Sequence, residues 1–280
     1  MKARIVVLLG LAVIVIWAAA FSLPDKNLHV VFCDVGQGDA TLLVRGRTQI
    51  LIDGGPNSDV VNCLARYMPF FDKQIELVVL THPHEDHFLG LISVLQRYSI
   101  TYFVMGEKGG EGKNYEELLT LVINKGIQID EFATGDGLKL GKGGILINFE
   151  TLWPDSRISL GMTNADPNSL SLVQLVRFGD FELLFTGDAD VRLWKERLNS
   201  NLSSLEILKV PHHASRTALD QAWISIIRPS LAVVSVGKNS YGHPDKETLG
   251  LLTAAGVGIK RTDLDGDVEV VSDGKKWWMR

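Results

Sequence analysis

The feature that most constrains this chain lies at residues 82–87, which read His-Pro-His-Glu-Asp-His and follow directly on the apolar run at residues 77–81. Three of the 7 histidines fall within this segment, a concentration that a solvated loop does not require. Imidazole and carboxylate groups are ligands of borderline metals such as zinc. The segment therefore predicts a metal site at the carboxyl end of a buried strand.

The spacing of these ligands indicates more than one ion. His82 and His84 are two positions apart on an extended segment, so their side chains point the same way. Asp86 and His87 lie beyond the turn and can face a second ion. The sequence contains no Cys-x-x-Cys pair, so histidines and carboxylates must supply the ligands.

Composition limits the class of protein. The chain has 280 residues, of which 46% are hydrophobic and 22% are charged, enough to bury a full core. No linker is visible after residue 27, so residues 27–280 are expected to form one domain. A net charge of -5 argues against a broad basic face that coats nucleic acid.

Residues 1–26 form a separate segment. Residues 5–20 carry no charge and follow Lys2 and Arg4, and the apolar stretch continues to Leu23. A bilayer-spanning helix needs about 20 apolar residues, and the positive flank keeps the N-terminus in the cytoplasm. The small residues at 18–20 also suit signal peptidase. Two main outcomes stay open: a single-pass anchor in the cytoplasmic membrane with the domain outside, or a cleaved signal and a secreted domain. A buried N-terminal helix is the third alternative.

The two cysteines, Cys33 and Cys63, do not make a disulfide framework. Cys33 lies inside the strand-like run at residues 30–33. We therefore expect two small buried residues in preference to a bridge, although an exported location permits a bridge.

Hydrophobic periodicity predicts alternating strands and helices, which is typical of a layered α/β domain. Residues 135–144 are rich in turn formers, and a closing hairpin is expected after residue 266. Two halves of similar content indicate a sandwich of two sheets flanked by helices. Strands are expected at residues 28–35, 40–44, 49–52, 77–81, 102–105, 145–153, 170–177, 181–185, 205–210 and 231–236, and helices at 60–67, 88–98, 115–124, 191–198 and 247–255.

Three later strands also end in polar motifs. The strand at 181–185 leads to Asp188, whose carboxylate can bridge two cations or, alternatively, cap the next helix. His212 and His213 follow another strand and are adjacent, so only one is expected to be a direct ligand while the other orients or protonates. His243 follows the strand at 231–236 and is either a site residue or a turn residue before Pro244.

Taken together, these motifs resemble the metallo-β-lactamase superfamily, and more specifically the hydrolase domain of ComEC-type competence proteins. The resemblance covers about residues 28–278. The motifs that carry it are His-x-His-x-Asp-His at 82–87, Thr-Gly-Asp at 186–188, the segments 34–40, 53–55 and 209–215, Asn168 with 171–173, and 236–237 with 241–244.

Three departures from this family pattern stand out. The multi-span channel of the full-length competence proteins is absent from this sequence, so a separate channel protein is an expected partner for any DNA translocation. His84 stands where many such domains have a carboxylate, which favours zinc over manganese. Ala214 replaces the usual glycine after the paired histidines.

The resemblance implies a four-layer αββα fold with a binuclear site. One ion is assigned to His82, His84 and Asp188, and the other to Asp86, His87, Asp188 and His212. The family position of a further ligand is matched best by Asn168, whose amide oxygen is a weaker ligand than imidazole.

The mechanism that the resemblance implies is metal-assisted hydrolysis, in which two cations lower the pKa of a water. Asp86 orients the nucleophile, and His243, with whichever of His212 and His213 is not a ligand, protonates the leaving group. The residues expected to hold a phosphate oxygen are Ser215, Lys238 and Tyr241.

The leading hypothesis for the substrate is a phosphodiester outside the cytoplasm, either nucleic acid or a component of the cell envelope. Two alternatives are kept: opening of a β-lactam or lactone, and a non-catalytic, membrane-tethered module that binds DNA or assists assembly.

Overall fold

The computed structural model describes residues 10, 25–106, 109–141, 144–155, 166–194 and 205–280. Its strands form two sheets, one of 8 strands in the order β15-β14-β1-β2-β3-β4-β5-β6 and one of 7 strands in the order β13-β12-β11-β10-β9-β8-β7. The strands are β1 Leu28–Phe32, β2 Thr41–Arg45, β3 Thr48–Ile52, β4 Gln74–Leu80, β5 Ser99–Gly106, β6 Gln128–Phe132, β7 Gly137–Leu140, β8 Ile147–Trp153, β9 Val173–Phe178, β10 Phe181–Phe185, β11 Ile207–Lys209, β12 Leu231–Val234, β13 Gly258–Arg261, β14 Val268–Ser272 and β15 Trp277–Met279.

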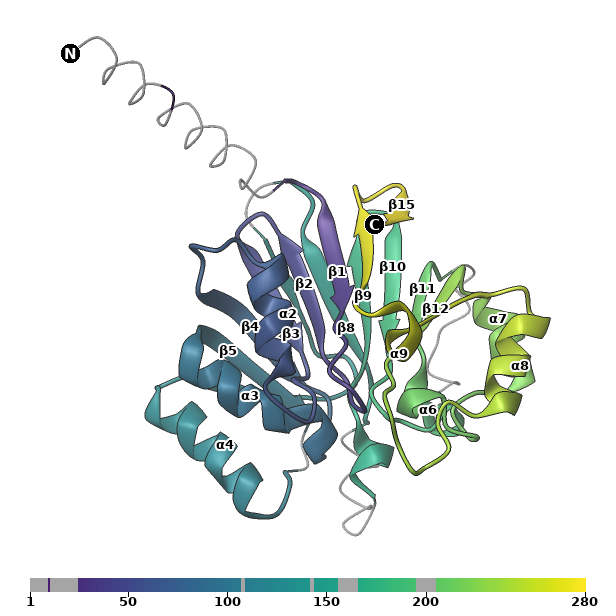
Figure 1. Ribbon diagram of the computed structural model, residues 1–280, viewed down its shortest axis with the longest axis horizontal. Helices are drawn as coiled ribbons and strands as arrows, with labels where there is room; N and C mark the ends of the chain where they lie inside the picture. The colour runs from purple at the N-terminus through teal and green to yellow at the C-terminus, as the bar shows by residue number, and fades with distance from the viewer. Residues whose placement is uncertain (1–9, 11–24, 107–108, 142–143, 156–165, 195–204) are drawn as a thin grey trace.

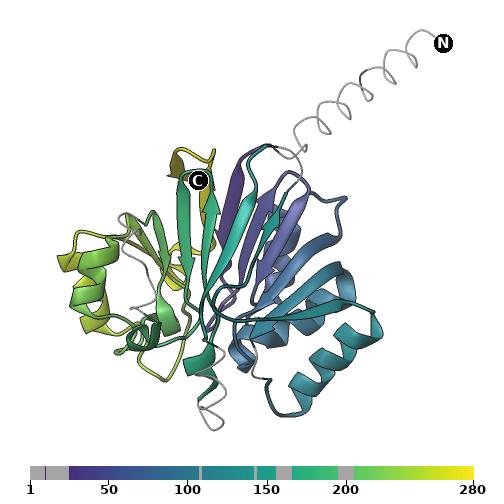
Figure 2. The same cartoon turned by 180° about the vertical axis from the view of Figure 1, so that it is seen from behind.

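Helices lie outside both sheets (Figure 1). The described helices are α2 Asp59–Tyr67, α3 Glu85–Arg97, α4 Lys113–Asn124, α6 Val191–Trp194, α7 Gln221–Ile227, α8 Lys246–Ala254 and α9 Thr262–Asp265, with short 3-10 helices at Pro167–Leu170 and Pro211–Ala214. One buried cluster joins α2, α3 and α4 to the first sheet, and another joins α7 and α8 to the second. A third cluster contains buried side chains of both sheets, which face each other in the view from behind (Figure 2).

Parallel strands bring the polar motifs to one edge of this sandwich. Strands β3 to β6 are parallel to one another, and so are β10 to β13. The carboxyl ends of parallel neighbours lie at the same edge of a sheet. The two edges meet, because the Leu172 N–H donates to the Thr81 carbonyl at 2.9 Å.

The closing hairpin belongs to the first sheet. β14 pairs antiparallel with β1, with Leu28 opposite Ser272. His29 Nδ1 also lies 2.7 Å from Glu269 Oε1, and this pairing, ahead of opposing burial, raises the pKa of His29. The last residues of the domain therefore hold its first strand in place.

The predicted two-sheet sandwich and its mixed α/β class are confirmed. The turn-rich reading of residues 135–144 was wrong in part, because β7 lies there and pairs with β8. Sequence periodicity also missed β6, β13, α7 and α9, which are 4 to 7 residues long and too short for a clear pattern. The helix expected at 191–198 is described only as α6, and its remainder lies outside the described residues.

The segment expected to anchor or export the domain, residues 5–23, lies outside the described residues except for Gly10. Within the described ranges, none of the helices has the length and apolarity needed to cross a bilayer.

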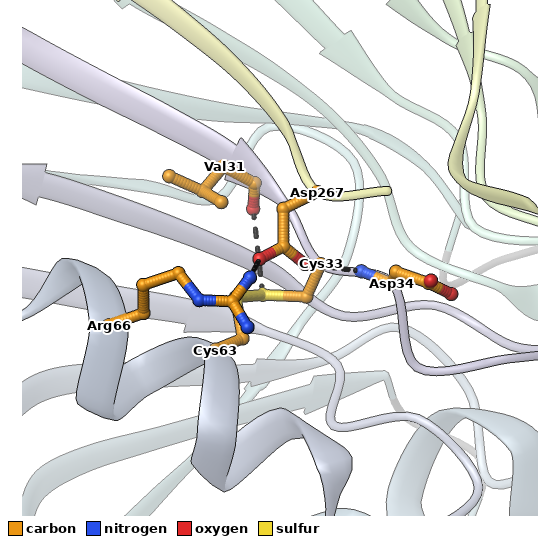
Figure 3. Close-up of a disulfide and its surroundings, with 6 residues drawn as sticks. All are labelled: Val31, Cys33, Asp34, Cys63, Arg66 and Asp267. Carbon is orange, nitrogen blue, oxygen red and sulfur yellow. Dashed lines mark hydrogen bonds and ion pairs between the residues drawn. A yellow bond between two sulfur atoms is a disulfide. The ribbon is translucent and has the colours of Figure 1, made fainter. Parts of the chain in front are cut away.

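The expectation of two unbridged cysteines was wrong. Cys33 and Cys63 form a disulfide with 5.9 Å between their Cα atoms, which joins the end of β1 to α2 (Figure 3). Nearby, the Asp267 carboxylate pairs with Arg66 and accepts the Asp34 N–H at 2.8 Å. The bridge depends on how α2 packs over the sheet, which local sequence does not reveal.

We expect the disulfide to stabilise the domain strongly. It closes a loop of 30 residues, for which chain entropy gives roughly 3–4 kcal/mol. A reductant should therefore lower the free energy of unfolding of the wild type in urea titrations. The Cys33→Ala/Cys63→Ala variant is the control and should be insensitive to reductant. Superimposable wild-type curves with and without reductant would contradict the bridge.

Candidate metal centre

The centre lies where the two sheet edges meet. β4 leads directly to His82, and α3 begins three residues later, which places Asp86 and His87 in its first turn. From the second sheet, β10 leads to Asp188 and β11 to His213.

Close backbone packing fixes the start of α3. A Cβ on Gly90 would lie 1.9 Å from the Gly54 carbonyl oxygen, so only glycine fits there. The Gly90 N–H donates to the Gly55 carbonyl at 2.9 Å, and the Gly54 N–H donates to the His87 carbonyl at 2.6 Å. The Asp-Gly-Gly segment therefore holds His87 against the end of the sheet.

Ligand atoms from both sheets converge on Asp188. Its carboxylate oxygens lie 3.4 Å from His87 Nε2 and 3.6 Å from His213 Nε2. His213 Nε2 also lies 3.3 Å from an Asp86 oxygen. Ligand atoms of His82, His87 and Asp188 lie within 4.8 Å of one another, as do those of Asp86, His87 and His213.

The chemistry of this group fits divalent cations. Among the described residues, His82 Nε2, His87 Nε2, His213 Nε2 and Asp188 Oδ1 are buried and make no hydrogen bond. Leaving such atoms unsatisfied costs about 1–3 kcal/mol each. Divalent cations would satisfy these atoms, so the residues present fit the expected metal ions.

Hydrogen bonds at Nδ1 orient two of the imidazoles. His87 Nδ1–H donates to Asp53 at 2.8 Å, and Asp53 also accepts the Thr81 N–H and hydroxyl at 2.8 and 2.7 Å. His213 Nδ1–H donates to the Ser235 carbonyl at 2.9 Å. Each ring therefore presents Nε2 to the centre, which is the usual arrangement of histidine ligands.

Three buried residues behind the centre, Asp39, Asp53 and Lys209, lie in the motif segments but were not predicted as site residues. Asp53 orients His87, and Asp39 forms an ion pair with Lys209 while lying 3.4 Å from His213 Nδ1. Charged residues directly at strand ends, Asp53 after β3 and Lys209 at the end of β11, are the sequence signal that could have identified two of the three.

Carboxylates and imidazoles lie next to each other at the centre, and each shifts the pKa values of its neighbours. Burial raises the pKa of Asp188, but His213 and His87 outweigh it and hold that pKa well below its usual range. Burial lowers the pKa of His213, but Asp188 and Asp39 raise it to about 9. Asp86 has a pKa of about 2, because His213 and His87 outweigh its burial. Without metal, protons on imidazole balance the carboxylates, and a metal must displace them.

A strained turn decides which adjacent histidine enters the centre. His212, His213 and Ala214 have φ values of 47°, 51° and 59°, a left-handed conformation that costs about 1–2 kcal/mol per residue. The turn buries His213 and leaves the His212 side chain 34% exposed, with Nε2 3.7 Å from Asp188. The geometry favours His213 as the direct ligand, and a ligand role for His212 stays a prediction.

The other predicted residues lie at different depths. The His84 side chain is 37% exposed, and its Nε2 lies 3.9 Å from Asp166, outside the close ligand groups, so its metal role also stays a prediction.

Asp188 does not cap the next helix, since Asp190 accepts the Arg192 N–H at 2.9 Å.

A cleft of about 1110 Å³ opens over the centre. Asn168, Lys238, Tyr241 and His243 line it, and their roles toward substrate stay predictions. Ser215 instead lines a smaller adjoining pocket of about 150 Å³, which shares Asn168, Asp188 and His212 with the cleft. The His243 ring centroid lies 5.3 Å from that of His212, and burial, with His212 and His213, lowers the pKa of His243.

Comparison with known proteins agrees with this fold. The family model described as "Metallo-beta-lactamase superfamily" matches residues 33–238. The solved metallo-beta-lactamase fold protein YhfI from Bacillus subtilis has a TM-score of 0.55 at 12% identity, covering 90% of this chain and 100% of that chain.

Curated relatives extend the similarity in sequence. ComE operon protein 3 of Bacillus subtilis is 26% identical over 86% of this chain and 32% of its own length. Competence protein ComA of Neisseria gonorrhoeae is 26% identical over 89% of this chain and 33% of its own length. This chain therefore spans about a third of these relatives, and the predicted resemblance to competence proteins is confirmed.

We expect His213→Ala to lose metal and His212→Ala to keep it. His213 presents a buried, oriented nitrogen, whereas His212 is half-exposed, so metal affinity should fall roughly 100-fold or more only in the first variant. Metal content after dialysis, measured by mass spectrometry, checks this. Full metal in His213→Ala together with loss in His212→Ala would reverse the assignment.

Proposed function

The chain belongs to the metallo-β-lactamase superfamily, and on this premise we propose that it is a metal-dependent hydrolase that cleaves phosphodiesters outside the cytoplasm. The observation that carries the proposal is the set of unpartnered ligand atoms from both sheets at the floor of an open cleft. A purely structural cluster has no reason to lie beneath so large an opening.

The metal ligands proposed here are His82, His87, Asp86, Asp188 and His213, with His84 and His212 at the rim as further candidates. Divalent cations, when bound, supply Lewis acidity toward the substrate and lower the pKa of a water nucleophile. Zinc is favoured over manganese because imidazoles dominate the set.

Two side chains of the protein act on the reacting groups: Asp86 orients the attacking water, and His243 protonates the leaving group. The Asp86 carboxylate stays ionised at a pKa of about 2 and can accept a hydrogen bond from the attacking water. His243 lies at the rim, where it can protonate the leaving oxygen. Its lowered pKa makes the protonated ring a stronger acid.

A phosphodiester suits the cleft walls. Lys238 offers a cation to a non-bridging oxygen, and Asn168 offers an amide. Tyr241 is 75% exposed and presents a ring on which a base or sugar can pack. The acidic residues Glu85 and Asp86 also line the cleft, so recognition is local and does not depend on a wide basic surface.

The relatives ComE operon protein 3 and competence protein ComA are about three times longer than this chain. The word competence in the second name supports a link of this chain to DNA. We therefore propose DNA as one substrate, with a separate channel protein as partner, and an envelope phosphodiester as the other. The Cys33–Cys63 bridge supports the extracytoplasmic location, because disulfides persist in oxidising compartments. The apolar segment at 5–23 supports tethering to the cytoplasmic membrane.

A second candidate function is a non-catalytic module that binds DNA and assists assembly. The same cleft would then hold a strand without cleaving it. Opening of a β-lactam or lactone uses similar metals but gives Lys238 and Tyr241 no phosphate to bind.

We expect the zinc- or manganese-loaded protein to hydrolyse a phosphodiester reporter or DNA, and Asp188→Ala to lose this activity together with metal. The carboxylate contacts both imidazoles, so its removal uncouples the ligand groups. Asp190→Ala, a carboxylate two residues away outside the centre, is the control and should retain activity. A metal-replete wild type that binds DNA without cleaving any phosphodiester would favour the non-catalytic module.

We expect His243→Ala to slow substrates with poor leaving groups most. General acid catalysis is worth roughly 10²–10⁴ in rate, and an activated phenolate does not need it. Turnover of an alkyl and a nitrophenyl phosphodiester should be compared at equal metal content. Equal losses on both substrates, or loss of metal, would show that His243 is not the acid.

A further inference from the structure

An aromatic pair stands exposed at the end of the domain opposite the metal centre. Phe70 is 77% and Phe71 is 48% exposed, and their ring centroids lie 5.3 Å apart in an edge-to-face arrangement. They occupy the short loop between α2 and β4. Large apolar groups exposed together on a loop mark a contact surface.

Basic side chains lie on the same loop and on the segments next to it. Arg47, in the turn between β2 and β3, is exposed and lies 3.5 Å from Asp72. Lys73 Nζ lies 4.9 Å from the centroid of the Tyr98 ring, and Arg97, next to Tyr98, is exposed. Asp72 is buried and offsets the charge of Arg47, so Lys73 and Arg97 supply the local excess of positive charge on a chain whose net charge is -5. We call Phe70, Phe71, Arg47, Lys73 and Arg97 the Phe70 surface.

Strand register places the Phe70 surface beside the start of the domain. Leu28 of β1 lies opposite the start of the β2–β3 turn, and the start of β4 lies beside that of β3. β1 and β4 are separated by three strand spacings, about 14 Å. The aromatic loop and the first strand therefore emerge at the same end.

The connection between the apolar N-terminal segment and β1 is short. Residues 24–27 connect the apolar segment that ends at Leu23 to Leu28, and this stretch reaches at most roughly 18 Å. If residues 5–23 lie in a bilayer, this end of the domain must lie next to the lipid headgroups. A tip of aromatic and basic residues suits that environment, where rings enter the interface and cations meet anionic lipids.

We propose that the Phe70 surface docks onto the anionic lipid surface of the membrane that holds the N-terminal segment. Phe70 and Phe71 enter the interface, and Arg47, Lys73 and Arg97 contact lipid phosphates. β4 has 7 residues and runs about 23 Å from this end to the metal centre, so the cleft opens away from the bilayer. The inference rests on the proposed membrane tethering and is independent of the hydrolase activity.

The test uses the full chain, reconstituted in vesicles of phosphatidylcholine with or without phosphatidylglycerol, with a protease site inserted between Pro24 and Asp25. After cleavage, flotation measures how much released domain stays with the vesicles. The wild-type domain should stay on anionic vesicles and be released by salt. Phe70→Ser should lower its partition coefficient roughly tenfold, and Lys73→Gln/Arg97→Gln should lower it about fivefold per charge on anionic vesicles alone.

The matched control is Leu264→Ser, which removes an apolar side chain of 72% exposure from α9 at the other end of the domain. It should leave the partition unchanged. Complete release of the wild-type domain, or equal losses in Phe70→Ser and Leu264→Ser, overturns the inference. So does a lipid-free dimer that Phe70→Ser dissociates, which would assign the surface to a second copy. A full chain that does not float before cleavage overturns the tethering and this inference together, whereas the hydrolase proposal would stand.

Discussion

The burial of one carboxylate between the two sheets is the constraint on which the site depends. Asp188 is 3% exposed and lies 3.4 Å from His87 of the first sheet edge and 3.6 Å from His213 of the second. A buried carboxylate without opposite charge is strongly unfavourable. The two halves of the sandwich must therefore present positive charge at this point, as imidazolium or as metal. The same requirement joins the halves and assembles the candidate metal centre.

Backbone strain is concentrated around that carboxylate. Asp53, which orients His87, has a φ of 58°, and the turn at 212–214 is left-handed throughout. Such conformations persist only where the surrounding structure compensates for them. Here the compensation comes from hydrogen bonds of Asp53 with Thr81 and His87 and of His213 with Ser235. Ligand positions are thus held before any metal arrives, which lowers the cost of assembling the centre.

The two ends of the sandwich have different chemistry. The carboxyl ends of the parallel strands collect charged and titratable groups around an open cleft, whereas the opposite end carries exposed aromatic and basic residues near the start of β1. The disulfide joins β1 to α2 and so braces the helix whose far end leads into the aromatic loop. An enzyme oriented in this way would face its substrate with the cleft and its membrane with the opposite end.

The sequence by itself determined which residues could serve as ligands. An apolar strand followed by His82 to His87, and another followed by Asp188, predicted two-ion chemistry at strand ends, because strand periodicity and ligand preference are local properties. The two-sheet sandwich also followed from the alternation of elements. Only the tertiary structure distinguishes His212 from His213, because a left-handed turn that neighbouring contacts impose buries the second and leaves the first partly exposed. The ligand role of each stays a prediction. The Cys33–Cys63 bridge, the return of β14 to pair with β1, and the placement of Asp39 and Lys209 behind the centre likewise depend on contacts between residues far apart in the chain, for which a single sequence carries no local signal.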